Sequence, residues 1–248
     1  MFLQFLDRSL LESFAGQSES LGLRLASQTT LDFLGVSLEL HGQFATTGAQ
    51  LIIANHPSSL DGLILLSQIP REDVYTVAAV ANSRFGPTFT DHMLPVYLSH
   101  QPKHYLIDYL RIPVVTRMEG NVSREEAMTR NRATIDEAAQ RLNNGQTVII
   151  FPGGSNPSPR NPWKKGVGFL LKSLSDPDTQ IVFAHIEGTD WGDSLRPTLV
   201  GQYAKRLSHT HVIVDTETHP LSFFDQSKTG QEIAAQLETM YRQSWPDR

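Results

Sequence analysis

The chain has 248 residues, a formal net charge of −5 at pH 7 and no cysteine. The lack of cysteine excludes disulfides, thiolate metal sites and thiol nucleophiles. The negative charge argues against a general nucleic-acid binder, which usually carries a strongly basic domain. The length fits a single α/β domain, and we expect a helical segment over residues 1–34 followed by one domain over residues 35–248.

Residues 1–34 interleave apolar with charged side chains and predict one or two amphipathic helices. Such helices either pack on the core or lie on a lipid surface, and the few basic residues disfavour the second interpretation. The first eight residues lack the basic leader and unbroken apolar run of a signal peptide. No stretch reaches the roughly 20 apolar residues that span a bilayer. We therefore expect a cytoplasmic protein, either soluble or peripheral on the cytoplasmic membrane face.

Apolar strands alternate with periodic helices along the rest of the chain. We expect strands near 36–41, 51–54, 74–80, 112–116, 147–151, 180–186 and 211–215, and helices near 58–69, 123–145, from 166 onward and 230–243. Two capping boxes, Ser123 with Glu126 and Thr229 with Glu232, mark helix starts. Residues 81–110 have no clean period and predict short helices and loops, with an apolar groove as one option. The fold class is therefore α/β, with a mainly parallel sheet flanked by helices on both faces.

His56 and Asp61 follow one of these buried strands and are five positions apart. On one helix side chains meet at spacings of three or four, and on a strand this pair would point to opposite faces. The two side chains can therefore meet only across a turn between strand and helix, which Pro57 favours. A carboxylate that holds one ring nitrogen leaves the other free to accept a proton from a hydroxyl. A capping box between Ser58 and Asp61 is the alternative that needs no chemistry.

The window Leu51 to Leu65, LIIANHPSSLDGLIL, resembles the first motif of the lysophosphatidate and glycerol-3-phosphate acyltransferases. A weaker resemblance extends from Leu34 to about Glu187. In that family the histidine is the general base that activates the acceptor hydroxyl, and the aspartate orients it. The resemblance therefore implies these catalytic roles for His56 and Asp61, and it makes Asn55 and Ser58 candidate substrate-binding residues.

The acceptors of that family carry a phosphate, which calls for Arg or Lys and free backbone N–H groups. Arg117 matches the arginine of the family's second motif. The third motif falls at residues 151–155, but Gly153 replaces its usual Glu and Asn156 stands in the place of its Arg. The candidate phosphate site comprises Arg117, Gly153, Gly154, Ser155, Arg160, Lys164 and Lys165. A tight Gly-Gly turn and a solvated basic loop are the alternatives.

The resemblance implies an O-acyltransferase of phospholipid biosynthesis. Its donor would be acyl-CoA or acyl carrier protein, and its acceptor lysophosphatidate, with glycerol 3-phosphate as the alternative. No cofactor, metal or covalent acyl-enzyme is implied. Partners would be a phosphorylated glycerol or lysophospholipid and a membrane surface, with no nucleic acid. His185 and Glu187, near the fourth motif, are expected neighbours of the site.

Three other classes of protein stay open at this stage. The first is a serine hydrolase that uses Ser58, Ser59 or Ser155, although the chain has no Gly-x-Ser-x-Gly elbow there. The second is a metal site on His56 and Asp61, although the usual helical His spacing is missing. The third is a non-catalytic lipid-binding protein of acyltransferase-like fold, which the altered third motif favours and the intact His–Asp pair disfavours.

Overall fold

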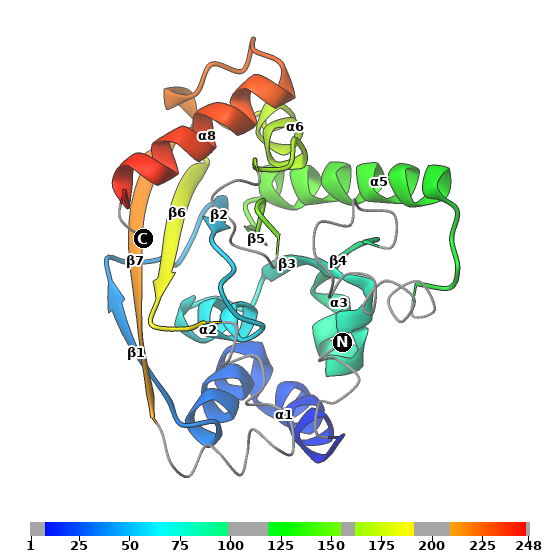
Figure 1. Ribbon diagram of the computed structural model, residues 1–248, viewed down its shortest axis with the longest axis vertical. Helices are drawn as coiled ribbons and strands as arrows, with labels where there is room; N and C mark the ends of the chain where they lie inside the picture. The colour runs from blue at the N-terminus through cyan, green and yellow to red at the C-terminus, as the bar shows by residue number, and fades with distance from the viewer. Residues whose placement is uncertain (1–7, 99–118, 155–161, 191–208, 247–248) are drawn as a thin grey trace.

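The computed structural model describes residues 8–98, 119–154, 162–190 and 209–246 (Figure 1). Its elements in chain order are α1 (Arg8–Phe33), β1 (Val36–His41), β2 (Gln50–Ala54), α2 (Asp61–Gln68), β3 (Val74–Ala79), η2 (Val80–Phe85), α3 (Pro87–Asp91), β4 (Met93–Val96), α5 (Arg124–Asn143), β5 (Thr147–Ile150), α6 (Gly166–Lys172), β6 (Gln180–Glu187), β7 (Thr210–Pro220), η4 (Leu221–Phe223) and α8 (Gly230–Ser244). The strand expected at 112–116 lies outside the described residues.

The strands form a seven-stranded sheet in the order β1-β7-β6-β2-β5-β3-β4. β6 and β7 pair antiparallel, and every other neighbouring pair is parallel. β1 and β7 therefore run opposite to the other five strands. The predicted α/β class with a mainly parallel sheet is confirmed.

Helices cover both faces of this sheet, as Figure 1 shows with α1, α2 and α3 below the strands and α5, α6 and α8 above them. The central strand β2 explains why two cores form. All of its residues are buried, as expected of a parallel strand covered on both sides. Ile52 and Ala54 join the core under α1 and α2, whereas Leu51 and Ile53 join the core under α5, α6 and α8.

Helix α1 contains a break at Gly22, whose φ of 82° is not helical, so the expected "one or two helices" are two helical segments joined at a kink. Leu11, Phe14, Leu23 and Leu31 are buried in the core that α1 shares with α2. Residues 1–7 lie outside the described part of the chain. Of the two arrangements expected for this segment, the described residues of α1 adopt packing on the core.

The segment from η2 to β4 forms short helices, as expected, but it also contains a strand that the sequence did not predict. Pro95 lies inside β4, and a proline usually argues against a strand; it is tolerated here because β4 is at the edge of the sheet. Phe85 and Phe89 pack edge-on against Phe14 of α1, with ring centroids 5.5 and 6.5 Å from it. These aromatic residues therefore belong to the core rather than to an apolar groove.

Two helix starts were predicted from capping residues. Thr229 and Glu232 form a complete capping box at α8, as predicted. At α5 the Ser123 side chain accepts from the backbone N–H of Glu126, so the N-cap is confirmed, but only this half of the box is present. Met128 is 63% exposed, so it does not belong to the buried face of α5 although its spacing would allow it. The buried stripe of α5 runs instead through Ala127, Thr134, Ala138, Ala139 and Leu142.

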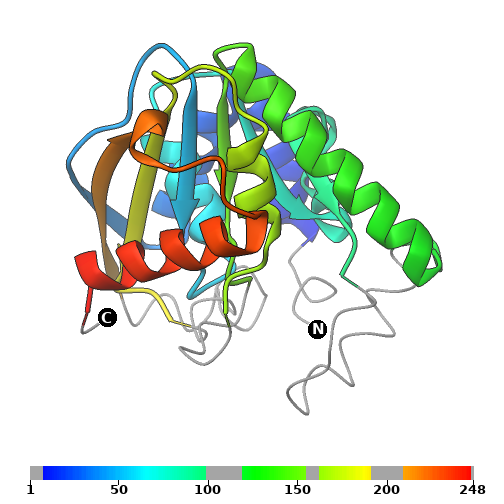
Figure 2. The ribbon, with the colours of Figure 1, turned by 90° about the horizontal axis from the view of Figure 1, so that it is seen from above.

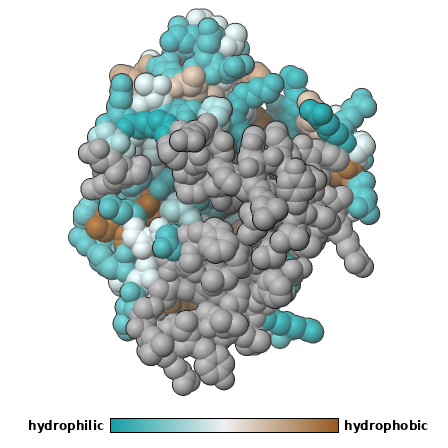
Figure 3. Space-filling view, viewed as in Figure 1, coloured by the Kyte–Doolittle hydropathy of each residue, from teal (hydrophilic) through white to brown (hydrophobic). Residues whose placement is uncertain are grey.

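The surface is mixed where the structure describes it. On the face in Figure 3 the described residues are mostly hydrophilic, and hydrophobic ones lie in small separate areas. Exposed large apolar side chains include Leu21, Leu25 and Phe33 of α1. No helix in the described part of the chain combines the length and apolar content needed to cross a membrane.

Candidate active site

The loop that follows β2 is tied to the neighbouring strand β6 at its first residue. The backbone ladder between these strands ends at the pair Ala54–Ala184. Beyond it, the Asn55 side chain donates to the carbonyl of Ile186 and accepts from the N–H of Ile186, both at 2.8 Å. Asn55 thereby replaces a backbone partner for β6. Both the oxygen and the nitrogen of its side-chain amide bond to the β6 backbone. These bonds fix the position of the chain just before His56.

His56 and Asp61 meet across the turn between β2 and α2. Nδ1 of His56 lies 2.8 Å from Oδ2 of Asp61, which is the first residue of α2. The His56 side chain is 22% exposed and that of Asp61 is fully buried. The predicted turn therefore brings together two side chains that no regular element could join, at the carboxyl end of the central strand, where ligands of parallel sheets bind.

Four donors surround the buried Asp61 carboxylate. Oδ2 accepts from His56 Nδ1 and from the Ser58 backbone N–H, at 2.8 Å each. Oδ1 accepts from the Ser58 hydroxyl at 2.8 Å and from the Thr189 hydroxyl at 3.4 Å. A buried carboxylate needs such partners, and here they also fix its orientation. The carboxylate can thus hold the His56 ring in one position.

Ser58 does not cap α2, so the alternative interpretation of Ser58 and Asp61 as a capping box does not hold. The N-cap of α2 is Leu60, whose N–H donates to the Ser58 hydroxyl at 3.1 Å. Ser58 is 4% exposed, and its hydroxyl donates to the carboxylate rather than to the histidine. In a serine nucleophile the hydroxyl would instead bond to the imidazole. The arrangement of Ser58 therefore suits support of Asp61 better than attack on a substrate.

One face of the His56 ring packs against Phe151, which is not among the site residues predicted from the sequence. The two rings stack with centroids 4.7 Å apart and planes at 28°. Phe151 follows β5, the direct neighbour of β2, so adjacent strand ends could have indicated this contact. Among the residues that the structure describes, none hydrogen bonds to Nε2 of His56. A histidine held at Nδ1, with Nε2 left without a hydrogen bond to the described residues, has the arrangement that a general base requires.

The glycine pair of the third motif forms a tight turn. Gly154 has a φ of 68°, and its N–H donates to the carbonyl of Phe151 at 3.0 Å. Lys164 contacts this turn. Its backbone N–H donates to the carbonyl of Pro152. Its Nζ lies 3.5 Å from the position that a Cβ atom would occupy if Gly154 had a side chain. Lys165 points elsewhere, with Nζ 5.9 Å from the ring centre of Phe169. Lys164 is thus the better placed of the two lysines beside the turn.

The remaining candidates divide into two groups. Arg117, Ser155 and Arg160 lie outside the described residues, so their roles stay predictions. His185 is buried at the end of β6, and its Nδ1 lies 2.9 Å from the hydroxyl of Tyr241 on α8. Glu187 is the last residue of β6.

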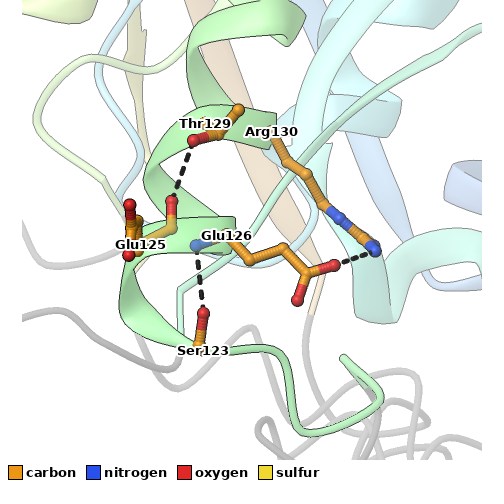
Figure 4. A pocket seen from close by; sticks show the side chains of 5 residues that line it. All are labelled: Ser123, Glu125, Glu126, Thr129 and Arg130. Atoms are coloured by element: carbon orange, nitrogen blue, oxygen red, sulfur yellow. Dashed lines mark hydrogen bonds and ion pairs between the residues drawn. The ribbon is translucent and has the colours of Figure 1, made fainter.

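A hollow of about 480 Å³ lies at the first turns of α5, lined by Ser123, Glu125, Glu126, Thr129 and Arg130 (Figure 4). Its lining groups already bond to one another: Glu126 accepts from Arg130 and donates its backbone N–H to Ser123, and Thr129 donates to the carbonyl of Glu125. This hollow contains neither His56 nor Asp61. We therefore place the candidate site at the ends of β2, β5 and β6.

The sequence model of the acyltransferase family matches residues 37–187, more than half of the chain. The chain belongs to the acyltransferase family. The matched span of this acyltransferase runs from β1 through β6 and includes the His–Asp pair, the Gly-Gly turn and Lys164. Thr189 and Tyr241, which contact the site from outside that span, could not have been found from the family motifs.

Among solved structures, the fold is similar to the crystal structure of the 1-acyl-sn-glycerophosphate (LPA) acyltransferase PlsC from Thermotoga maritima. The two sequences are 14% identical, the TM-score is 0.48, and the match covers 91% of this chain and 79% of that chain. Comparison with curated proteins gives no match.

Proposed function

We propose that this acyltransferase moves a fatty acyl group from acyl-CoA or acyl carrier protein to the hydroxyl of lysophosphatidate, with His56 as general base. The observation that carries the proposal is the 2.8 Å bond between His56 Nδ1 and the buried Asp61 carboxylate. It favours the imidazole tautomer with the proton on Nδ1, because a carboxylate can only accept. That tautomer leaves the lone pair of Nε2 to take a proton.

In the proposed reaction, Nε2 of His56 removes the proton of the acceptor hydroxyl as its oxygen attacks the thioester carbonyl. Asp61 stabilises the imidazolium that forms. The tetrahedral intermediate then collapses, the carbon–sulfur bond breaks, and the imidazolium returns its proton to the departing thiolate. The products are the ester and the free thiol, so no oxidant, metal or covalent acyl-enzyme is required.

Lys164 and the Gly-Gly turn are the part of the described site that suits a phosphate. The ammonium group stands over the turn, and glycines without side chains let an anion approach the backbone. Three sequence candidates outside the described residues, Arg117, Ser155 and Arg160, would complete this site. A phosphate held here lies on the same sheet edge as His56, because the turn begins at Phe151, which stacks on the His56 ring.

The decisive experiment combines purified protein with labelled acyl-CoA or acyl carrier protein and a panel of acceptors, followed by identification of the product. Lysophosphatidate is expected to become phosphatidate, and glycerol 3-phosphate is the matched acceptor that lacks an acyl chain. Preferential acylation of glycerol 3-phosphate would identify it, instead of lysophosphatidate, as the acceptor. Hydrolysis of the thioester without transfer to any acceptor would refute the proposal.

The two neighbouring lysines provide a matched pair for the phosphate site. Lys164→Ala is expected to raise the apparent KM for the phosphorylated acceptor by about ten- to a hundredfold, the equivalent of one charged hydrogen bond. Lys165→Ala should leave that KM within about twofold, since surface charges contribute little. Equal effects of the two substitutions on KM would show that the Lys164 charge acts only through the overall electrostatic potential of the site and not through a direct contact with the phosphate.

A further inference from the structure

The hydroxyl of Tyr241 fills the place where β2 and β6 separate beside the catalytic turn. After the last backbone pair, Ala54–Ala184, the Tyr241 hydroxyl donates to the carbonyl of Ala184 at 3.2 Å. It also lies 2.9 Å from Nδ1 of His185. Because the hydroxyl donates to Ala184, its oxygen is left to accept from His185. The hydroxyl thus binds the two residues of β6 that precede Ile186, whose backbone holds the Asn55 side chain.

This hydroxyl keeps its proton under all ordinary conditions. Tyr241 is 7% exposed, and burial raises the pKa of its hydroxyl well above the usual range, opposed only in part by the Asn55 hydrogen bond. A phenol that stays neutral remains both a donor and an acceptor at every pH at which the protein would be assayed. Its bonds to Ala184 and His185 therefore do not depend on the charge of the phenol.

Around Tyr241, helix α8 and its C-cap also contact the segment after β5 and the strand β6. The Trp163 ring centre lies 5.3 Å from that of Tyr241. The backbone N–H of Trp163 donates to the Glu238 carboxylate of α8 at 2.8 Å. Trp245 stacks on His185 at 5.2 Å. Figure 2 shows α8 lying across the strands. Helix α8 and its C-cap therefore contact β6 and the segment after β5, next to the strand end that carries His56.

We propose that Tyr241, which lies beyond the span matched by the family, is a positioning residue for the turn that carries His56. Its hydroxyl holds the Ala184 carbonyl of β6, and two residues further along β6 the Ile186 backbone holds the Asn55 side chain, next to His56. Loss of the hydroxyl releases one side of this link while the ring continues to fill the core. The expected loss of turnover on removal of the Tyr241 hydroxyl rests on the proposed role of His56 as general base. The expected change in the position of the His56 ring does not depend on that role.

The test compares Tyr241→Phe with Tyr75→Phe. Tyr75 packs against the same core, and its hydroxyl lies 3.1 Å from Arg141, but it stands near the start of β3, away from the catalytic turn. The first readout is the NMR resonance of the ring Cε1–H of His56, assigned with His56→Ala. We expect this resonance to shift in Tyr241→Phe and to stay in place in Tyr75→Phe. The second readout is turnover: kcat should fall on the order of tenfold in Tyr241→Phe, with the acceptor KM within about twofold.

An unchanged His56 resonance in folded Tyr241→Phe, or equal losses of kcat in the two variants, would overturn the inference. If the wild-type protein acylates none of the acceptors, the proposed function fails, whereas the resonance still decides whether Tyr241 positions His56. If Tyr241→Phe does not fold, His185→Phe takes its place, because it removes one donor to the same hydroxyl and keeps a ring against Trp245. This variant should shift the His56 resonance in the same direction, and no shift would count against the inference.

Discussion

Two histidine–carboxylate pairs in this protein have the same length and different surroundings. His56 Nδ1 lies 2.8 Å from Asp61 at the carboxyl end of β2, and His41 Nδ1 lies 2.8 Å from Asp215 on the neighbouring strands β1 and β7. In the second pair the other ring nitrogen, Nε2, is also occupied, at 2.8 Å from Glu39. His41 therefore has no nitrogen left to act as a base, whereas Nε2 of His56 hydrogen bonds to none of the described residues.

Burial separates the two pairs further. The side chains of His41 and Asp215 are 50% and 21% exposed, against 22% and 0% for His56 and Asp61. The hydrogen bonds that the His41 ring donates to Glu39 and, next in size, to Asp215 raise the pKa of His41 above its ordinary value of 6.5, which favours a protonated, solvated ring. A short distance to a carboxylate does not by itself make a general base. A fixed, buried carboxylate and one unoccupied ring nitrogen do.

The largest difference between the pairs is expected when each aspartate loses its charge. Asp61→Asn should lower kcat by about 10²–10⁴-fold, because the imidazolium loses its counter-charge and the ring its orientation. Asp215→Asn should leave kcat within about twofold. Steady-state kinetics on the two proteins, with circular dichroism to verify folding, make the comparison. Similar kcat values in the two variants would mean that Asp61 is merely structural.

A smaller effect is expected from the donors that hold Asp61. Ser58→Ala removes the hydroxyl that donates to Oδ1 at 2.8 Å and leaves the Leu60 N–H without its acceptor. We expect a loss of about 1–3 kcal/mol in the free energy of unfolding and a roughly tenfold lower kcat. Ser59→Ala, at the exposed neighbouring residue, is the control for both measurements. A stable but fully active Ser58→Ala protein would show that the carboxylate needs no such support.

The smallest effect concerns stability at the β1–β7 cluster. The pKa of His41 is raised, so its contribution is fully present below pH 6.5 and is lost as the pH rises through the raised value. The pKa of Glu39 is lowered, chiefly by its hydrogen bond to His41, so its contribution is present above pH 4.5 and is lost as the pH falls through the lowered value. The melting temperatures of wild type and His41→Gln should therefore differ most between pH 4.5 and 6.5. A difference that grew above that range would have the wrong sign.

The central part of the fold could be predicted from the sequence because its signals are local. The unbroken apolar run of β2 and the capping box of α8 fix their elements almost to the residue. β4 could not be predicted because it contains Pro95, and a proline argues against a strand. Its place at the sheet edge, where proline is tolerated, is known only from the tertiary structure. The direction of β7, antiparallel to β6, likewise depends on long-range pairing that no local pattern encodes.

The site shows the same division between local and distant contacts. The meeting of His56 and Asp61 follows from spacing and Pro57, since both residues lie in one short segment. Phe151 and Thr189 reach the pair from the ends of other strands, and Tyr241 supports the turn from the last helix. Contacts between residues so far apart in the sequence depend on strand order, which the sequence pattern alone did not specify.

The most direct test of the catalytic role of His56 is a single-turnover measurement of acyl transfer to lysophosphatidate by wild type, His56→Ala and His41→Ala. Wild type and His41→Ala should form phosphatidate at rates within about twofold of each other, and His56→Ala should be slower by at least about a hundredfold. All three proteins should melt cooperatively. A folded His56→Ala protein that retains the wild-type rate would contradict the assignment of His56 as the general base.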